Sequence, residues 1–224
     1  MTSRPARAPT VVNLCFHGIG TPDRELEPDE AQYWVGEEQF DELLEVVRRE
    51  PSLRVTFDDG NASDVGIALP ALRRAGLAAS FFLIAGRFGQ RGSVDLDGVR
   101  ELARAGMTVG NHGLRHRPWR SLDANGEREE LLEARAAIAG AAGQPVDEAS
   151  FPFGEYDRGA LRAVRRAGFQ RVYTVDGGPA RADAWLQPRH TVTGSETPAS
   201  LERLARAGRV ALKQTVGSTL KRWR

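Results

Sequence analysis

The sequence predicts an α/β fold, a distorted or incomplete (β/α) barrel of about seven parallel strands in a single domain. Chain length, the alternation of apolar runs with helical patterns, and a phrase that recurs at helix ends support this prediction. The chain has 224 residues, and domains usually contain ~100–200 residues. A doubly wound open sheet is the alternative arrangement of the same elements.

The recurring phrase joins the end of a helix to the start of a strand. In residues 72–84, 102–110 and 164–175, arginines precede Ala-Gly, and a short apolar run follows. Basic residues near the end of a helix interact favourably with its dipole, and a glycine just past the end can adopt left-handed geometry. Helix and strand therefore alternate, which predicts parallel βα units.

The remaining elements follow from apolar runs and capping signals. Glu37 and Glu38 place favourable charge at the start of the first helix, Pro51 follows its end, and Asn125 is expected to cap the fourth. Residues 18–36 are irregular and predict a lid or a binding loop. The predicted strands are 10–16, 53–57, 77–84, 107–111, 149–152, 169–175 and 186–192. The predicted helices are 37–50, 63–75, 95–105, 126–142, 155–167 and 198–212.

The composition is that of a globular, water-soluble domain, with 41% hydrophobic and 27% charged residues. A net charge of +1 excludes the strong positive field that nucleic-acid binding requires. A single cysteine, Cys15, cannot form an internal disulfide and fits a reducing compartment. The apolar run 11–16 is too short for a secretory core of ~7–15 residues or a spanning helix of ~20. We therefore expect a cytoplasmic protein, and the oligomeric state is left open.

The two ends of the chain differ from the domain. We expect residues 1–9 to be a flexible N-terminus, residues 10–212 to form the barrel domain, and residues 213–224 to form a basic tail. The tail is compatible with weak contact to an anionic membrane surface, which would make the protein membrane-peripheral. The alternative, which the interrupting Gly217 favours, is the end of a last packed helix.

Reactive side chains follow several predicted strands and are expected on one rim of the barrel. His112 and His116 are four residues apart, and Gly113 and Pro118 indicate a loop. One carboxylate and two imidazoles form a catalytic metal site with open positions, and a second acid can activate water. The residues at strand ends are His17, Asp58, Asp59, His112, His116, Phe153, Gly154 and His190.

Three motifs in the chain resemble those of the polysaccharide deacetylase family, carbohydrate esterase family four. They are residues 56–60 (Thr-Phe-Asp-Asp-Gly), the pair His112 and His116, and residues 151–154 (Phe-Pro-Phe-Gly). The resemblance runs from about residue 10 to residue 192. It implies a distorted (β/α) barrel that removes N- or O-acetyl groups from sugars with a divalent metal. Zinc is the expected ion, with cobalt, nickel or manganese as alternatives.

The resemblance also implies residue roles. Asp58 would be the general base that deprotonates water, and Asp59, His112 and His116 would hold the metal. The backbone N–H of Phe153 would help to hold the oxyanion.

The chain departs from the family pattern at three places. Gly113 stands where Ser or Thr usually follows the first histidine. Ser150 stands where an arginine usually braces the catalytic aspartate. The late Leu-x-His motif that supplies the general acid is not evident, and residues 186–190 are the nearest stretch.

Two residues can supply the missing parts. Arg189, at the end of the last strand, is expected to replace the bracing arginine. His17 is the expected general acid and is favoured over His190 because it directly follows the first strand. A loop histidine without a catalytic role is the alternative for His17.

Trp34, Trp119 and Trp185 are candidates for stacking on a sugar ring, and Gly154 is expected to line the site with them. Packing in the outer wall of the core is the alternative for each tryptophan. The expected function is metal-dependent N-deacetylation of an acetylated sugar, polysaccharide or glycan precursor. An amidase acting on a non-sugar substrate and a non-catalytic sugar- or metal-binding protein are the alternatives. Two adjacent carboxylates at Asp58 and Asp59 favour catalysis, because they repel each other unless a cation is present.

Overall fold

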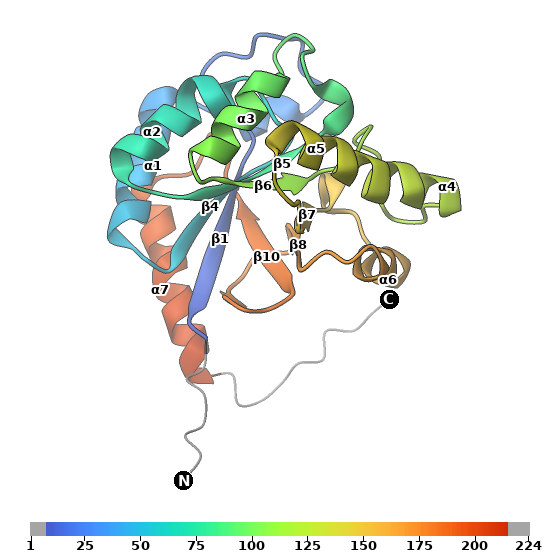
Figure 1. Ribbon diagram of the computed structural model, residues 1–224. Helices are drawn as coiled ribbons and strands as arrows, with labels where there is room; N and C mark the ends of the chain where they lie inside the picture. The colour runs from blue at the N-terminus through green and yellow to red at the C-terminus, as the bar shows by residue number, and fades with distance from the viewer. Residues whose placement is uncertain (1–7, 215–224) are drawn as a thin grey trace.

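Seven parallel strands close into a barrel, and the helices lie around its outside (Figure 1). The structure is a computed structural model that describes residues 8–214, with side chains described for residues 8–208. Most of the predicted N-terminal segment 1–9 and of the predicted basic tail 213–224 therefore lies outside the described residues. No helix in residues 8–214 is both long enough and apolar enough to cross a membrane.

All seven predicted strands form, each with its ends within two residues of the prediction. The barrel strands are β1 (Thr10–Phe16), β4 (Leu53–Phe57), β5 (Ala79–Leu83), β6 (Thr108–Asn111), β7 (Glu148–Ser150), β8 (Arg171–Thr174) and β10 (Leu186–Thr191). Three shorter strands were not predicted: β2 (Gly18–Ile19), β3 (Trp34–Val35) and β9 (Ala180–Arg181).

The first and last barrel strands pair with each other and close the sheet. Leu14 of β1 lies opposite Val55 of β4 on one side and opposite His190 of β10 on the other. This pairing confirms the barrel and excludes the doubly wound open sheet. The distortion lies at β7, where a single pair, Asn111 and Ala149, joins β6 to β7.

The predicted helices are also present, with ends within three residues of the prediction. The longer ones are α1 (Glu37–Arg49), α2 (Leu69–Ala75), α3 (Leu96–Arg104), α5 (Ala134–Ala142), α6 (Arg158–Arg166) and α7 (Pro198–Gln214). The π-helical turn η2 (Asp64–Ala68) leads into α2, while α4 (Ala124–Glu127) and the π-helical turn η4 (Arg128–Glu133) lead into α5. Short 3-10 turns are η1 (Glu30–Tyr33), η3 (Ala85–Arg87) and η5 (Pro152–Gly154).

Aspartates cap three of these helices. The side chains of Asp95, Asp123 and Asp157 accept hydrogen bonds of 2.8, 2.7 and 2.8 Å from the backbone N–H three residues further on. Each bond satisfies an N–H group that has no partner inside the helix. The expectation that Asn125 caps the fourth helix is wrong, because Asp123 does so and Asn125 lies inside α4.

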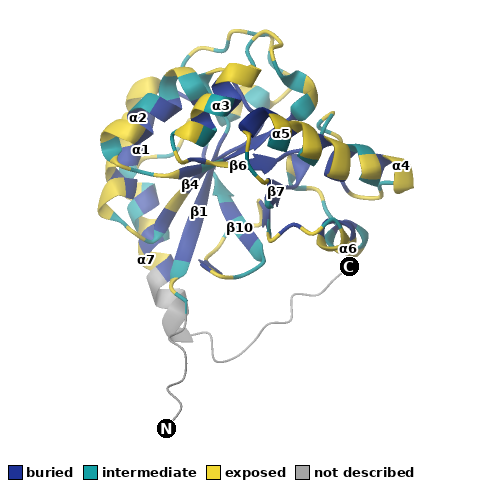
Figure 2. Ribbon diagram, in the orientation of Figure 1, coloured by how far each residue is buried: buried dark blue, intermediate teal, exposed yellow. Residues whose placement is uncertain are grey.

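The core lies between the strands and the surrounding helices, whose outer faces are exposed (Figure 2). Phe16, Phe57 and Phe81 come from three adjacent strands, and their neighbouring ring centroids are 5.5 and 4.6 Å apart. Successive strand side chains point to opposite faces. The barrel interior is therefore left to the alternate, polar positions, among them Asn13 and Thr56.

Candidate active site

The carboxyl ends of the barrel strands surround one pocket of about 340 Å³. Parallel strands in a barrel bring these ends to the same rim, as the sequence predicted. The loop 27–33 closes one side of the pocket with Pro28, Asp29 and Tyr33, in agreement with the expected binding loop. The predicted site residues that line the pocket are His17, Asp58, Asp59, His112, His116, Phe153 and Gly154.

Asp59, His112 and His116 form a cluster with the spacing of metal ligands. Asp59 Oδ1 lies 3.5 Å from His112 Nε2 and 3.3 Å from His116 Nε2. Two ligand atoms that are each ~2.0–2.2 Å from one tetrahedral zinc ion lie ~3.3–3.6 Å apart. Asp59 Oδ1 is also buried without a hydrogen-bond partner, which a bound cation would supply. The donor set therefore fits a divalent ion.

The surrounding backbone orients these ligands. His112 Nδ1 donates a hydrogen bond of 3.0 Å to the carbonyl oxygen of Ser150, which leaves Nε2 free to bind a cation. Burial and the charge of His112 lower the pKa of His116 to about 4, so its imidazole is neutral at pH 7. Asp59 and His116 have φ angles of 77° and 55°, and such backbone strain in non-glycine residues is concentrated at functional sites.

Asp58 stands beside this cluster but has different partners. Both of its carboxylate oxygens accept hydrogen bonds of 2.6 Å from Arg189. Ser150 Oγ lies 3.1 Å from the same carboxylate and 2.6 Å from Arg189 Nη2. The small side chain of Ser150 thus leaves room for a guanidinium group that comes from β10 instead of β7. The expected contact between Arg189 and Asp58 is present.

This contact keeps Asp58 ionised. Burial raises the pKa of the Asp58 carboxyl, but the positive charges of Arg189 and His112 lower it by a larger amount. The resulting pKa is well below the ordinary value. The carboxylate is therefore able to accept a proton at neutral pH.

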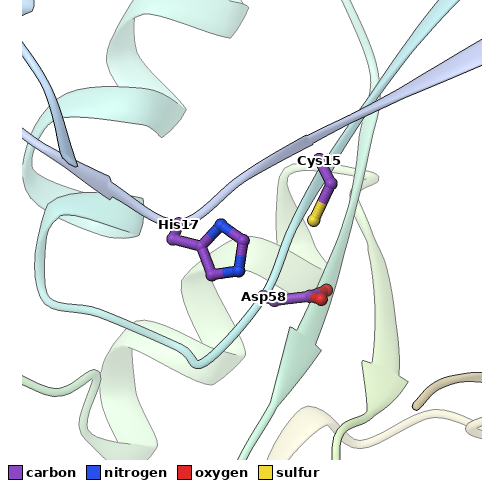
Figure 3. A group of neighbouring side chains, drawn as sticks. All are labelled: Cys15, His17 and Asp58. Carbon is purple, nitrogen blue, oxygen red and sulfur yellow. The ribbon is translucent and has the colours of Figure 1, made fainter. Parts of the chain in front are cut away.

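Cys15, His17 and Asp58 form a second group of neighbouring side chains (Figure 3). Their ligand atoms lie within 4.8 Å of one another. Because Arg189 binds both oxygens of Asp58, this group suits a metal less well than the cluster around Asp59. Burial raises the pKa of the Cys15 thiol, which is fully enclosed.

The structure distinguishes the two candidates for the general acid. His17 lines the pocket beside Asp58, and its ring packs against Tyr33 with centroids 5.1 Å apart. His190 lies on the opposite face of β10 from Arg189, and its Nε2 is 2.8 Å from Glu196 Oε1. Of these two histidines, His17 lines the pocket and His190 does not.

Phe153 and Gly154 stand at the rim after β7. The Phe153 side chain is 54% exposed, and its ring centroid lies 4.2 Å from that of His116. Gly154 has a φ of 66°, and a Cβ atom there would lie 2.1 Å from Val175 Cγ2. The turn therefore requires glycine and presents an aromatic face to the pocket.

The three tryptophans do not line the pocket in the described part of the chain, which corrects their expected role. Trp119 is 1% exposed and packs edge-on against Phe151 in the core. Trp185 precedes β10 at the opposite end of the barrel, where its Nε1 donates to the Phe169 carbonyl oxygen. Trp34 covers Gly18, where a Cβ atom would lie 2.2 Å from the indole ring.

Tyr33 and Phe153 are the aromatic residues that line the pocket instead. Tyr33 and Arg87 were not predicted as site residues; Arg87 lies in η3 after β5. The position of Tyr33 in the irregular loop after the first strand was the available signal for it.

Comparison with known proteins agrees with the motifs. The sequence profile named Polysaccharide deacetylase matches residues 45–172, more than half of the chain. YxkH of Bacillus subtilis (strain 168) is 24% identical over 207 residues, which cover 85% of this chain and 72% of YxkH. A chitooligosaccharide deacetylase from Rhizobium leguminosarum bv. trifolii is 28% identical over 141 residues, 62% of each chain.

Solved structures share the fold. The Streptococcus pyogenes deacetylase PplD, solved in complex with acetate, superposes with a TM-score of 0.77 at 19% identity over 88% of this chain and 99% of its own. IcaB from Ammonifex degensii gives a TM-score of 0.72 at 22% identity over 91% of this chain and 98% of its own. The profile matches more than half of the chain, and the acids and histidines of the matched motifs line one pocket. The chain therefore belongs to the polysaccharide deacetylase family.

Proposed function

We propose that this protein is a divalent-metal-dependent hydrolase that removes the N-acetyl group from an acetylated sugar, polysaccharide or glycan precursor. The observation that carries the proposal is that two adjacent aspartates, Asp58 and Asp59, have different partners. Asp59 points an unpartnered oxygen at two imidazoles, whereas Asp58 is held ionised by Arg189. A metal ligand beside a separate base is what metal-assisted amide hydrolysis needs.

The residues have separate roles in the proposed reaction. A divalent ion held by Asp59, His112 and His116, with zinc expected, would supply Lewis acidity to polarise the acetyl carbonyl. Asp58 takes a proton from the water whose oxygen bonds to the carbonyl carbon, and the backbone N–H of Phe153 donates to the resulting oxyanion. His17 then gives a proton to the sugar nitrogen as the C–N bond breaks. Acetate and a free amine are the products.

The shape of the pocket supports a sugar as substrate. Its volume of about 340 Å³ lies at the lower end of the ~300–1,000 Å³ typical of small-molecule sites. Tyr33, from the turn η1, and Phe153, from the turn η5 after β7, both line it. Aromatic rings of this kind present apolar faces on which a sugar ring can pack. The name of the related chitooligosaccharide deacetylase points to the same class of substrate. The acetate bound to the deacetylase PplD agrees with acetate as a product.

The test is acetate release from a panel of N-acetylated oligosaccharides, simple N-acetyl sugars and sugar nucleotides, with zinc-loaded protein. Asp58→Asn is the control, because it removes the base and keeps the shape of the side chain. We expect acetate from at least one sugar substrate and a rate ~10²–10⁴-fold lower for the control. Release from simple non-sugar acetamides alone would support the amidase alternative. No release above the control would support a binding protein.

A further inference from the structure

The segment between the two histidines of the metal cluster is held by hydrogen bonds to its backbone. The N–H of Gly113 donates 2.9 Å to Asn111 Oδ1. The N–H of Leu114 donates 2.8 Å to Glu130 Oε2, and the N–H of Arg115 lies 3.3 Å from both carboxylate oxygens of Glu130. Three successive N–H groups thus have side-chain acceptors, and for two of them the acceptor is a single anion, the Glu130 carboxylate.

Glu130 supplies that anion from inside the protein. It is 0% exposed and lies on the π-helical turn η4, far from its partners in sequence. A buried carboxylate is strongly unfavourable unless hydrogen bonds satisfy it, so Leu114, Arg115 and Glu130 stabilise one another. Asn111 Nδ2 also donates 2.9 Å to the Glu130 backbone oxygen, which fixes η4 to the end of β6.

Gly113 is the residue that makes room for this carboxylate. Its φ is 92°, and a Cβ atom built there would lie 2.3 Å from Glu130 Oε2. A side chain at this position would push the carboxylate away from its hydrogen-bond donors. The departure from the family pattern at Gly113 therefore has a physical reason in the position of Glu130.

We propose that Glu130 is a positioning residue that holds the loop between His112 and His116 in the conformation that binds metal. Without the carboxylate, two N–H groups would lose their acceptor and the loop would relax, which moves the two imidazoles apart. His116 has a φ of 55°, a strained conformation that persists only when its surroundings hold it. This inference rests on the proposed metal site.

The test measures zinc affinity of the full chain by competition with a chromophoric chelator, together with the visible spectrum of the cobalt-substituted protein. Glu130→Gln keeps the shape of the side chain but turns one acceptor into a donor. We expect zinc affinity to fall ~10–100-fold, the range found when a group that orients a metal ligand is removed. The cobalt bands should also shift. Glu133→Gln, the same change on the exposed face of η4, should leave both unchanged.

Thermal unfolding with zinc and with chelator separates positioning from simple stability. A structural role alone lowers both melting temperatures equally, whereas the proposal predicts that the increase caused by zinc becomes smaller. If the Glu130→Gln variant does not fold, Glu130→Asp, which retains the charge, replaces it in the same measurements. The zinc affinity of Glu130→Asp should also be lower than that of the parent. Unchanged zinc affinity in a folded Glu130 variant overturns this inference. Absence of zinc binding by the parent chain instead overturns the metal site itself.

Discussion

Arg189 reaches from β10 to the carboxylate of Asp58 at the end of β4, and β1 lies between the two strands. The guanidinium nitrogens lie 2.6 Å from both carboxylate oxygens, and Arg189 is 0% exposed. A bidentate pair of this kind is among the stronger hydrogen-bonded contacts in proteins. It fixes the direction of the proposed base and keeps the base charged.

Replacement of Arg189 by methionine should move the pH dependence of catalysis. Arg189 lowers the pKa of Asp58 and burial raises it, so loss of Arg189 leaves burial to raise that pKa. At pH 7 more of the base is then protonated, and activity should fall ~100-fold or more. The acidic limb of kcat/KM against pH should shift to higher pH, with partial recovery as the pH rises. The same limb in parent and variant would contradict the role of Arg189.

The replacement of Arg189 by methionine should also lower the free energy of unfolding. Removal of one partner of a buried ion pair leaves an uncompensated charge and typically costs about 3–5 kcal/mol. The loss should be larger at pH 7 than at low pH, because Asp58 contributes stability only while it is ionised. Urea unfolding at several pH values measures this difference.

His17→Ala should lower kcat strongly without removing metal. His17 lines the pocket beside Asp58 but is separate from the Asp59 cluster. Loss of a general acid typically lowers the rate ~10²–10⁴-fold. Bound zinc should stay near one ion per chain. His190→Ala is the matched control and should retain activity, since His190 contacts Glu196 outside the barrel. Full activity of the His17 variant would show that another group gives the proton.

Tyr33→Ala should change catalysis, whereas Trp119→Ala should change stability. Tyr33 lines the pocket and packs on His17, so its loss should raise KM or lower kcat and leave unfolding almost unchanged. Trp119 is buried, and its truncation should lower the free energy of unfolding by about 3–5 kcal/mol. Steady-state kinetics and urea unfolding of both variants check the pair. A stable Trp119 variant with impaired sugar binding would instead restore its predicted stacking role.

Most helices and strands could be predicted from local sequence patterns. Arginines before Ala-Gly marked helix ends, and the apolar runs after them became β5, β6 and β8. Closure of the barrel was only one of two possibilities, because it depends on the pairing of β1 with β10, which are far apart in sequence. Asn125 was misplaced as a cap because Asp123, two residues earlier, offers the same chemistry.

The site was predictable where motifs or strand ends marked it. Asp58 and His112 follow their strands directly, and Asp59 and His116 come shortly after them. All four line one pocket, as expected. The tryptophans were not predictable, because the burial of a large aromatic side chain depends on which elements pack around it. Glu130 gave no signal for the same reason: its role exists only because η4 packs against the end of β6.

The proposed reaction depends on one divalent ion that Asp59, His112 and His116 hold beside Asp58. Elemental analysis of the full chain, loaded with zinc and then dialysed, tests it most directly when parent and Asp59→Ala are compared. We expect one zinc per parent chain and a large loss in the variant, while both remain folded by circular dichroism. A parent chain without stoichiometric metal, or an Asp59→Ala chain that keeps it, would show that these three residues do not form the metal site.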